Sequence, residues 1–306
     1  MVEFSAYDYR FHELPSDDAA VSLRNQLISL RDLARSAPLE HGTQFTLDLQ
    51  IPPQNQHPAA RQVPSTLTTD RFQSATVTLQ LDKALQSGCD KFSQVWTATV
   101  IGVPETRLVV KIIQPSLCFI PEPDNIHWCE AYYDPLDLAH NEAWVYQKLA
   151  HRQGLSIPYF FGIFDIVTPS GEAAWVLVLE FIQGPTIHGV AKLSKNNKDM
   201  VHDFCNLGLD AVRELALSGW TLRDMSCSNF ILSSSSGSKA VVMIDLYDAV
   251  YVKPPPTLKR LAMVDANRFF YWFQLCVRDE YPGFYDWAMQ NLPVVVWGPP
   301  DFKEDM

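Results

Sequence analysis

The sequence is poor in positive charge and has no long apolar run. Lysine and arginine total 24 against 35 aspartates and glutamates in 306 residues, giving a formal net charge of −11. A protein that binds the phosphate backbone of nucleic acid needs a basic surface, so we expect no nucleic-acid partner. The apolar stretches 173–181 and 240–246 are too short to span a bilayer, so we also expect no membrane partner.

The start of the chain also lacks the features of a secretory signal. The segment MVEFSAYDYRFHELPSDD contains no basic region that leads into an apolar stretch. We therefore expect a cytoplasmic protein.

Cysteine motifs are absent as well. The cysteines form no CxxC pair and have no histidines at zinc-finger spacing, and the eight histidines are dispersed. We expect free thiols, with no disulfide framework and no structural zinc site. The six cysteines are Cys89, Cys118, Cys129, Cys205, Cys227 and Cys276.

Apolar residues make up 47% of the sequence, which is enough to bury a full core. Residues 17–36 carry apolar side chains at helical spacing and predict an amphipathic helix. From 38 to about 69 the composition shifts to Pro, Gln, Thr and His, which is typical of a poorly packed linker. We therefore assign residues 1–69 to an N-terminal helix and a Pro-rich linker.

Residues 70–183 predict an antiparallel sheet of five strands with one helix. The strand candidates are rich in Val, Ile, Thr and Leu, and the segment 138–154 repeats apolar residues at helical spacing before Gly154. The five predicted strands are 74–81, 93–100, 107–113, 159–167 and 173–181.

Residues 184–306 predict a mostly helical region. A strong helix candidate covers 199–218, and apolar helices follow after Lys259. Between them, SSSSGS supplies turn chemistry for a hairpin of strands 230–232 and 241–245. The predicted class is α+β.

Three charged or polar groups stand where phosphoryl transfer from ATP would need them. Lys111 lies inside the apolar strand VVKII, where a charge is costly unless it reaches a ligand, a counter-ion or solvent. Asp224 precedes Asn229 by five residues, and Asp245 ends an apolar strand sixteen residues later. A cation for the phosphates, oxygen ligands for Mg²⁺ and a carboxylate for the accepting hydroxyl are the needs of this reaction.

This order resembles the protein kinase superfamily, whose catalytic loop has an asparagine at the same offset from its aspartate. The resemblance implies that Asp224 is the catalytic aspartate and that Asn229 and Asp245 are magnesium ligands. Glu142 resembles the helix glutamate that pairs with the strand lysine. Taken alone, Lys111 and Glu142 could each be solvent-facing residues, but their order with the loop argues against coincidence.

The resemblance also implies a nucleotide site. QSGCDKFSQVWTATV occupies the place of the family's glycine-rich loop, although Gly88 is its only glycine. Val95 fits the apolar position above adenine. The backbone of Leu179, Glu180, Phe181 and Ile182 would bind adenine as the hinge segment, and a buried strand end is the alternative.

Several positions depart from the family pattern. Leu222 stands in place of the histidine of His-Arg-Asp, and Tyr247 in place of the glycine of Asp-Phe-Gly. No Ala-Pro-Glu follows, and 61 residues remain after Asp245, which implies a bilobal kinase-like fold with a shortened C-terminal lobe. In this the chain is similar to kinase-like proteins of filamentous and mushroom-forming fungi, and to small-molecule kinases of the aminoglycoside and choline phosphotransferase type.

The function implied by the resemblance is an ATP-dependent phosphotransferase that uses ATP and Mg²⁺. Lys111 and Glu142 would orient the phosphates, and Asp224 would take the proton of the acceptor hydroxyl, on a protein serine or threonine or on a small molecule. A pseudokinase that serves as a nucleotide-binding or scaffold module is the alternative. The single glycine, Leu222 and Tyr247 favour it.

Overall fold

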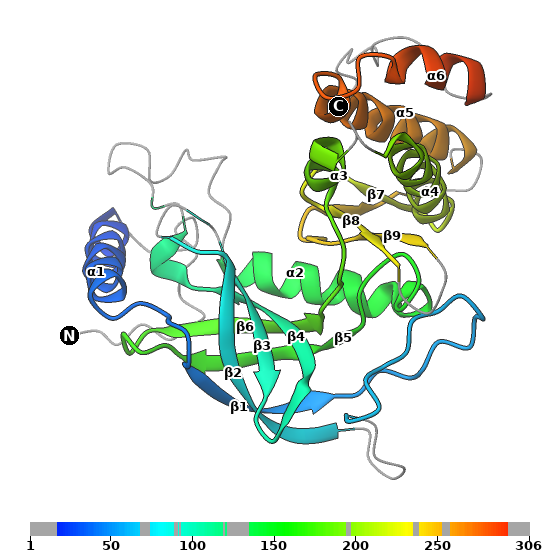
Figure 1. The fold of residues 1–306 in the computed structure, drawn as a ribbon. Coiled ribbons are helices and arrows are strands. Elements are labelled where there is room, and N and C mark those ends of the chain that lie inside the picture. The colour runs from blue at the N-terminus through cyan, green and yellow to red at the C-terminus, as the bar shows by residue number, and fades with distance from the viewer. Residues whose placement is uncertain are drawn as a thin grey trace. The chain divides into compact units, whose positions relative to one another are not determined.

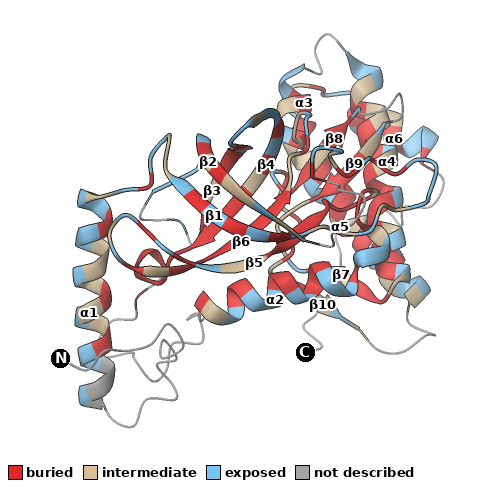
Figure 2. Cartoon of the chain, turned by 90° about the horizontal axis from the view of Figure 1, so that it is seen from below, coloured by how far each residue is buried: buried red, intermediate tan, exposed pale blue. Residues whose placement is uncertain are grey.

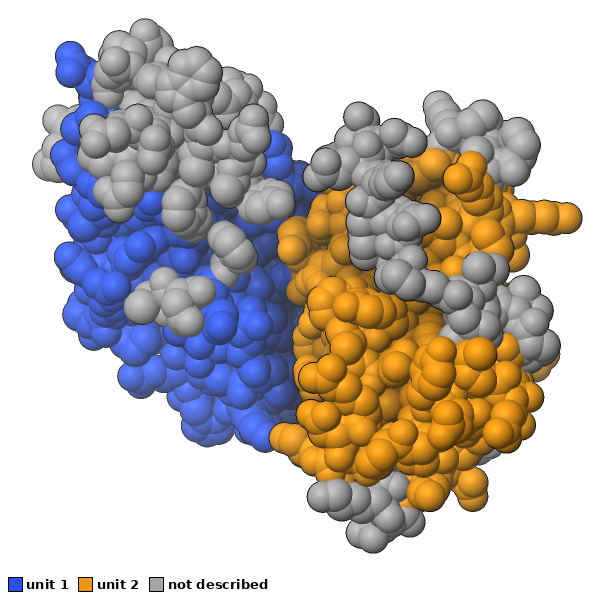
Figure 3. Space-filling model, turned by 90° about the horizontal axis from the view of Figure 1, so that it is seen from above, with its two compact units in different colours: residues 1–54, 62–148, 159–181 blue, residues 55–61, 149–158, 182–306 orange. Residues whose placement is uncertain are grey.

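The computed structural model describes residues 17–67, 74–88, 91, 93–118, 120, 135–193, 197–234, 239–252 and 258–292. The chain divides into two compact units, which are coloured separately in Figure 3. The first unit comprises residues 1–54, 62–148 and 159–181, and the second comprises 55–61, 149–158 and 182–306.

The first unit is built on a six-stranded antiparallel sheet in the order β1-β2-β3-β4-β6-β5 (Figure 1). The edge strands β1 and β5 also contact each other, so the sheet curls until it is nearly closed. The strands are β1 (Gln44–Gln50), β2 (Ser74–Gln86), β3 (Gln94–Val100), β4 (Val103–Ile113), β5 (Phe160–Val167) and β6 (Ala173–Glu180).

The inner face of this sheet forms the core of the first unit. Because successive side chains of a strand point to opposite faces, β1 alternates between buried and exposed residues, as Figure 2 shows. Its buried side chains, Phe45, Leu47 and Leu49, join a cluster with apolar residues of the other five strands. That cluster includes Leu79, Leu81, Trp96, Ala98, Val110, Ile112, Phe161, Val176 and Val178.

Two helices pack in the first unit. In α1 (Asp17–Ser36), Leu23 and Leu27 are buried, and Arg31 donates to backbone carbonyls in and just after the 3-10 helix η2 (Pro115–Leu117). The second helix, α2 (Pro135–Lys148), contacts β4, β5 and β6. The helix α1 lies where the spacing of apolar residues predicts it. The helix α2 begins three residues before the predicted segment 138–154 and ends six residues before its end.

The second unit combines helices with two small antiparallel sheets. One sheet pairs β7 (Trp220–Leu222) with β10 (Ala249–Tyr251), and the other pairs β8 (Phe230–Ser233) with β9 (Ala240–Met243). The helices α4 and α5 pack so closely that a Cβ on Gly208 would lie 2.2 Å from the ring of Phe269. The helices are α3 (Ile187–Leu193), α4 (Lys198–Leu217), α5 (Leu258–Val277), α6 (Phe284–Asn291) and the 3-10 helix η4 (Ala150–Arg152).

Four predictions about the fold are wrong. The segment 38–69 is not a poorly packed linker, because it supplies β1 and the buried side chains of Val63 and Leu67. The sheet therefore has six strands and is nearly closed, where five strands in a kinase-like lobe were expected. Residues 184–306 do not form a mostly helical lobe in the part that the structure describes, because β7–β10 are interleaved with the helices. The bilobal kinase-like fold class is thus not the one observed.

No helix in the described ranges has both the length and the apolar composition needed to cross a membrane.

The integration of β1 can be tested by stability. Leu49 is fully buried and Gln50 points to the exposed face. We expect Leu49→Ala to lower the free energy of unfolding by about 2–5 kcal/mol, because it leaves a cavity in the core. Gln50→Ala should change it by less than about 0.5 kcal/mol. Urea unfolding measures both free energies. Equally small changes in the two variants would contradict the packing of this segment and support a linker.

Candidate functional site

A buried ion pair joins the sheet of the first unit to α2. The Nζ atom of Lys111 on β4 lies 2.6 Å from Oε2 of Glu142 on α2, and the side chains are 8% and 0% exposed. A lone charge at either position would be strongly unfavourable, and pairing offsets this cost. Neither residue is therefore a solvent-facing side chain, and the pair that the resemblance implies is formed.

The sheet register places other predicted site residues on the face of Lys111. Lys111 stands opposite Val95 on β3 and opposite Leu177 on β6, and directly opposed residues of an antiparallel pair project to the same face. Leu179 lies two residues beyond Leu177, so it shares that face too. Val95, Lys111 and Leu179 therefore lie on the same face of the sheet.

The predicted hinge segment lies where the chain leaves the first unit. Phe181 is the last residue of that unit, and Ile182 begins a stretch of the second. The backbone N–H of Glu180 donates to the carbonyl of Tyr159 at 2.9 Å, and its carboxylate accepts from the N–H of Tyr159 at 3.0 Å. The N–H of Glu180 already donates to a carbonyl within the first unit, so it is not available to donate a hydrogen bond to adenine.

Gly88 follows β2 in the connection to β3. It is exposed and has a φ of 123°, in the region that favours glycine. The N–H of Lys91 donates to the carbonyl of Gly88 at 3.4 Å. Asp90 lies outside the described residues.

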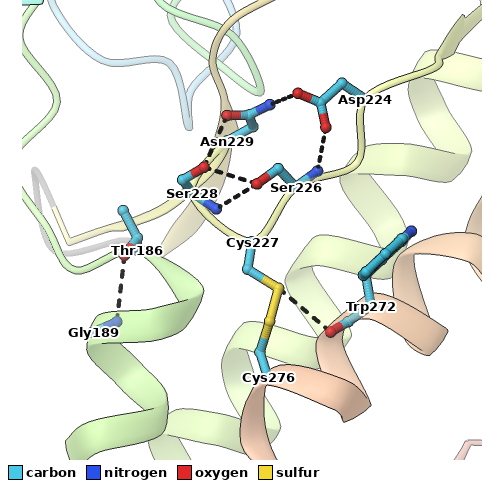
Figure 4. Close-up of a disulfide and its surroundings, with 9 residues drawn as sticks. All are labelled: Thr186, Gly189, Asp224, Ser226, Cys227, Ser228, Asn229, Trp272 and Cys276. Atoms are coloured by element: carbon cyan, nitrogen blue, oxygen red, sulfur yellow. Dashed lines mark hydrogen bonds between the residues drawn. A yellow bond between two sulfur atoms is a disulfide. The ribbon is translucent and has the colours of Figure 1, made fainter. Parts of the chain in front are cut away.

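In the second unit, Asp224 and Asn229 are joined within one loop after β7. The carboxylate of Asp224 accepts from the backbone N–H of Ser226 at 3.0 Å and from Nδ2 of Asn229 at 3.1 Å (Figure 4). The Oδ1 atom of Asn229 accepts from the hydroxyl of Ser228 at 3.3 Å. Asp224 is half-buried and Asn229 is buried. These bonds fix the direction of both side chains.

The β8–β9 hairpin brings Asp245 to the same end of the second unit. Phe230 pairs with Met243, and the next N–H along the returning strand, that of Ile244, donates to the carbonyl of Asn229 at 2.9 Å. Asp245 therefore follows directly beside Asn229. Carboxylate and amide oxygens are hard ligands of the kind Mg²⁺ takes, so the side chains of Asn229 and Asp245 have the ligand chemistry for this ion.

The backbone of Asp245 is strained. Its φ is 62°, and it is the one non-glycine residue with positive φ in the part of the chain that the structure describes. Such a conformation costs on the order of 1–3 kcal/mol and persists where the surrounding structure imposes it, often at functional sites. The strained backbone of Asp245 therefore points to a functional role independently of the chemistry of its side chain.

A charged pair on α5, the buried Asp265 and the partly exposed Arg268, supports the Asp224 loop, and no sequence pattern predicted it. Arg268 donates to the carbonyls of Leu222 at 3.0 Å and Arg223 at 2.8 Å, and to Oδ1 of Asp265 at 3.2 Å. Asp265 is 1% exposed and accepts from the hydroxyl of Thr221 at 2.9 Å. Burial raises the pKa of Asp265, and the bonds from Thr221 and Arg268 oppose that shift. The one signal of this pair in the sequence was Asp265, a lone aspartate on the apolar face of a predicted helix.

Asp248 ties the loop that follows Asp245 to the loop of Asp224. Its carbonyl accepts from the N–H of Arg223 at 3.3 Å, and its carboxylate lies 4.0 Å from the guanidinium of Arg223. Burial raises the pKa of Asp248, the charge of Arg223 opposes the shift, and the charge of Asp224 adds to it. The two loops are therefore linked by electrostatic interactions between their side chains as well as by a backbone hydrogen bond.

A disulfide also anchors the Asp224 loop, which corrects the expectation of free thiols for this pair. Cys227, inside the loop, is bonded to Cys276 on α5, 49 residues away in sequence (Figure 4). Cys118 and Cys205 are free thiols and buried. Cys89 and Cys129 lie outside the described residues.

The predicted site residues thus fall into two groups. Val95, Lys111, Glu142 and Leu179 belong to the first unit, and Asp224, Asn229 and Asp245 belong to the second. A scan against protein-family models found no match, and a search of curated proteins found none either.

A double-mutant cycle tests the buried pair. We expect Lys111→Met or Glu142→Leu alone to lower the free energy of unfolding by about 3–5 kcal/mol, because each leaves a buried charge unpaired, whereas the double variant should approach the unmodified protein. The matched control is the pair Lys239–Asp203, which has the same 2.6 Å separation but is half-exposed and should couple by at most about 1 kcal/mol. Additive losses at Lys111 and Glu142 would contradict the assignment.

Proposed function

We propose that this protein is an ATP-dependent phosphotransferase that uses the residue set of the protein kinase superfamily. The observation that carries the proposal is the ion pair of Lys111 and Glu142, at 2.6 Å and almost fully buried. Any buried lysine needs a counter-ion, and here the partner is Glu142 on α2, the residue that the resemblance implies. In the proposed reaction that carboxylate holds the amine in a fixed direction, toward the phosphates.

Each of the remaining residues has one task in this proposal. ATP would supply the γ-phosphate, and Mg²⁺ would neutralise negative charge on the phosphate oxygens. Asn229 and Asp245 would hold the metal through oxygen atoms, and Asp224 would orient the acceptor hydroxyl and accept its proton. The bonds from Ser226 and Asn229 to Asp224 support this role, because a general base must be positioned before it reacts.

The acceptor is a hydroxyl, either on a protein serine or threonine or on a small molecule. The cytoplasm is the compartment in which we place this reaction, and it supplies ATP and Mg²⁺.

A pseudokinase is the second candidate, and the side chain of Asn229 favours it. Its Nδ2 donates to Asp224 and its Oδ1 accepts from Ser228, so a metal ion would have to share that oxygen with the Ser228 hydroxyl. The connection from β2 to β3 has a single glycine, Gly88, which limits how closely backbone amides approach phosphates. In this candidate the protein binds nucleotide or a partner and transfers nothing.

Turnover of ATP separates the two candidates. We expect the purified chain with Mg²⁺ to consume ATP, and Asp224→Asn to lower kcat by about 10²–10⁴-fold, because a positioned base contributes that much. Asp279→Asn, at a site whose side chain is 84% exposed, should leave kcat unchanged. Equal turnover by the Asp224 variant and the unmodified chain would end the enzymatic proposal.

A thermal-shift titration runs beside the turnover assay. Specific binding of ATP with Mg²⁺ should raise the melting temperature with concentration, and the Lys111→Met shift should be smaller. A shift without turnover would support the nucleotide-binding module, and the absence of both would support a scaffold.

Arg268 is expected to act as a positioning residue for Asp224. Arg268→Ala removes the bonds to the carbonyls of Leu222 and Arg223, so we expect kcat to fall by about a hundredfold while KM for ATP stays within twofold, roughly as for other misplaced catalytic groups. Arg268→Lys cannot span both carbonyls and should recover only part of the rate. Arg278→Ala, whose side chain is 63% exposed, is the control. A rise in KM with unchanged kcat would contradict a positioning role.

A further inference from the structure

Two cysteines and one histidine from three different elements gather beside the Asp224 loop. Cys227 lies in that loop, Cys276 in the last turn of α5, and His188 in α3. Their sulfur and ring-nitrogen atoms all lie within 4.8 Å of one another. Over the described ranges, no other set of three His, Cys, Asp or Glu side chains comes close enough to hold a metal ion.

The chemistry of this cluster matches zinc. Two thiolates and one imidazole are ligands that Zn²⁺ prefers, and three protein ligands leave a fourth position for water. Bond lengths of about 2.3 Å to sulfur and about 2.1 Å to nitrogen put tetrahedral ligand atoms roughly 3.6–3.8 Å apart. The 4.8 Å limit therefore requires only small side-chain movements once the two sulfurs are separated.

Burial is graded across the cluster in a way that suits ion entry. Cys227 is 4% exposed, Cys276 is partly buried and His188 is exposed. The histidine is therefore the solvent-facing ligand, and an ion can approach from its side without opening the core. The Cys227 sulfur also lies 3.4 Å from the carbonyl oxygen of Trp272 (Figure 4), which keeps it close to α5.

We propose that His188, Cys227 and Cys276 form a redox-controlled Zn²⁺ site, in which the disulfide excludes the metal and the reduced pair binds it. In the oxidised state both sulfurs are used in the bond between them. In the reduced state they become two anionic ligands, and His188 becomes the third.

The exchange between the two states balances with a dithiol as the reductant. The dithiol is oxidised to its own disulfide, and its two electrons and two protons pass to the sulfurs of Cys227 and Cys276 as their bond breaks. Binding of Zn²⁺ then releases both protons to solvent and leaves two thiolates on the metal. His188 contributes a neutral ring nitrogen and loses no net charge.

The other described thiols lack this combination. Cys205 is fully buried, and burial raises the pKa of its thiol, while Cys118 is 1% exposed and lies 3.6 Å from the carbonyl of Gln114. Within the part of the chain that the structure describes, neither belongs to a group of metal-ligating side chains. Zinc bound by the reduced chain should therefore depend on His188 and the Cys227–Cys276 pair.

Zinc titration of the full chain tests the site. The protein is reduced with a dithiol, the dithiol is removed under argon, and Zn²⁺ is titrated against a chromophoric chelator without nucleotide. We expect one Zn²⁺ per chain for the reduced protein and none for the disulfide form. His188→Ala should weaken binding by at least about tenfold. His140→Ala, which also removes an exposed helix histidine, should bind as the unmodified chain does.

Alkylation mapping gives a second measurement that needs no variant. Bound Zn²⁺ should protect Cys227 and Cys276 of the reduced chain from an alkylating reagent, as read by peptide mass spectrometry. Equal alkylation of both cysteines with and without Zn²⁺, or equal zinc affinity of the His188 and His140 variants, would overturn the proposal. Because no step uses ATP, these results stand whether or not the phosphotransferase proposal holds.

Discussion

Burial of charge is the constraint on which this structure depends. Lys111 and Glu142 are almost fully buried, so each stabilises the fold only while the other is present. On α5 the buried Asp265 likewise has a charged partner, the partly exposed Arg268. Each pair joins different elements: the first ties α2 to β4, and the second ties α5 to the backbone before the Asp224 loop. A buried charge thus fixes the position of the elements that carry the candidate chemistry.

Periodicity in the sequence predicted most single elements, because apolar spacing decides which face is buried. The helix at 17–36 and the strands near 160–167 and 173–180 follow that pattern. The strand at 44–50 was missed because Pro and Gln around it outweighed the alternation of its own apolar residues. The closure of the sheet was out of reach, since it depends on contact between strands more than 100 residues apart. The disulfide was missed because its 49-residue separation leaves no spacing motif.

The backbone that leads into the Asp224 loop is supported by a side chain from α5. Leu222 is buried and cannot hydrogen-bond through its side chain. Its carbonyl is instead held by Arg268, which also reaches the next carbonyl, that of Arg223. A planar guanidinium suits two neighbouring acceptors. No motif predicts this contact, because the partners are backbone atoms and the arginine comes from a helix more than 40 residues further along the chain.

The disulfide bears on the same loop. Under reducing conditions disulfides are usually transient. A lasting tether between the Asp224 loop and α5 would then need another cross-link. His188 beside the two sulfurs supplies the missing ligand for one. Oxidation and metal binding would each cross-link the same two sulfurs, and in both states Asp224 and Asn229 stay on a loop anchored to α5.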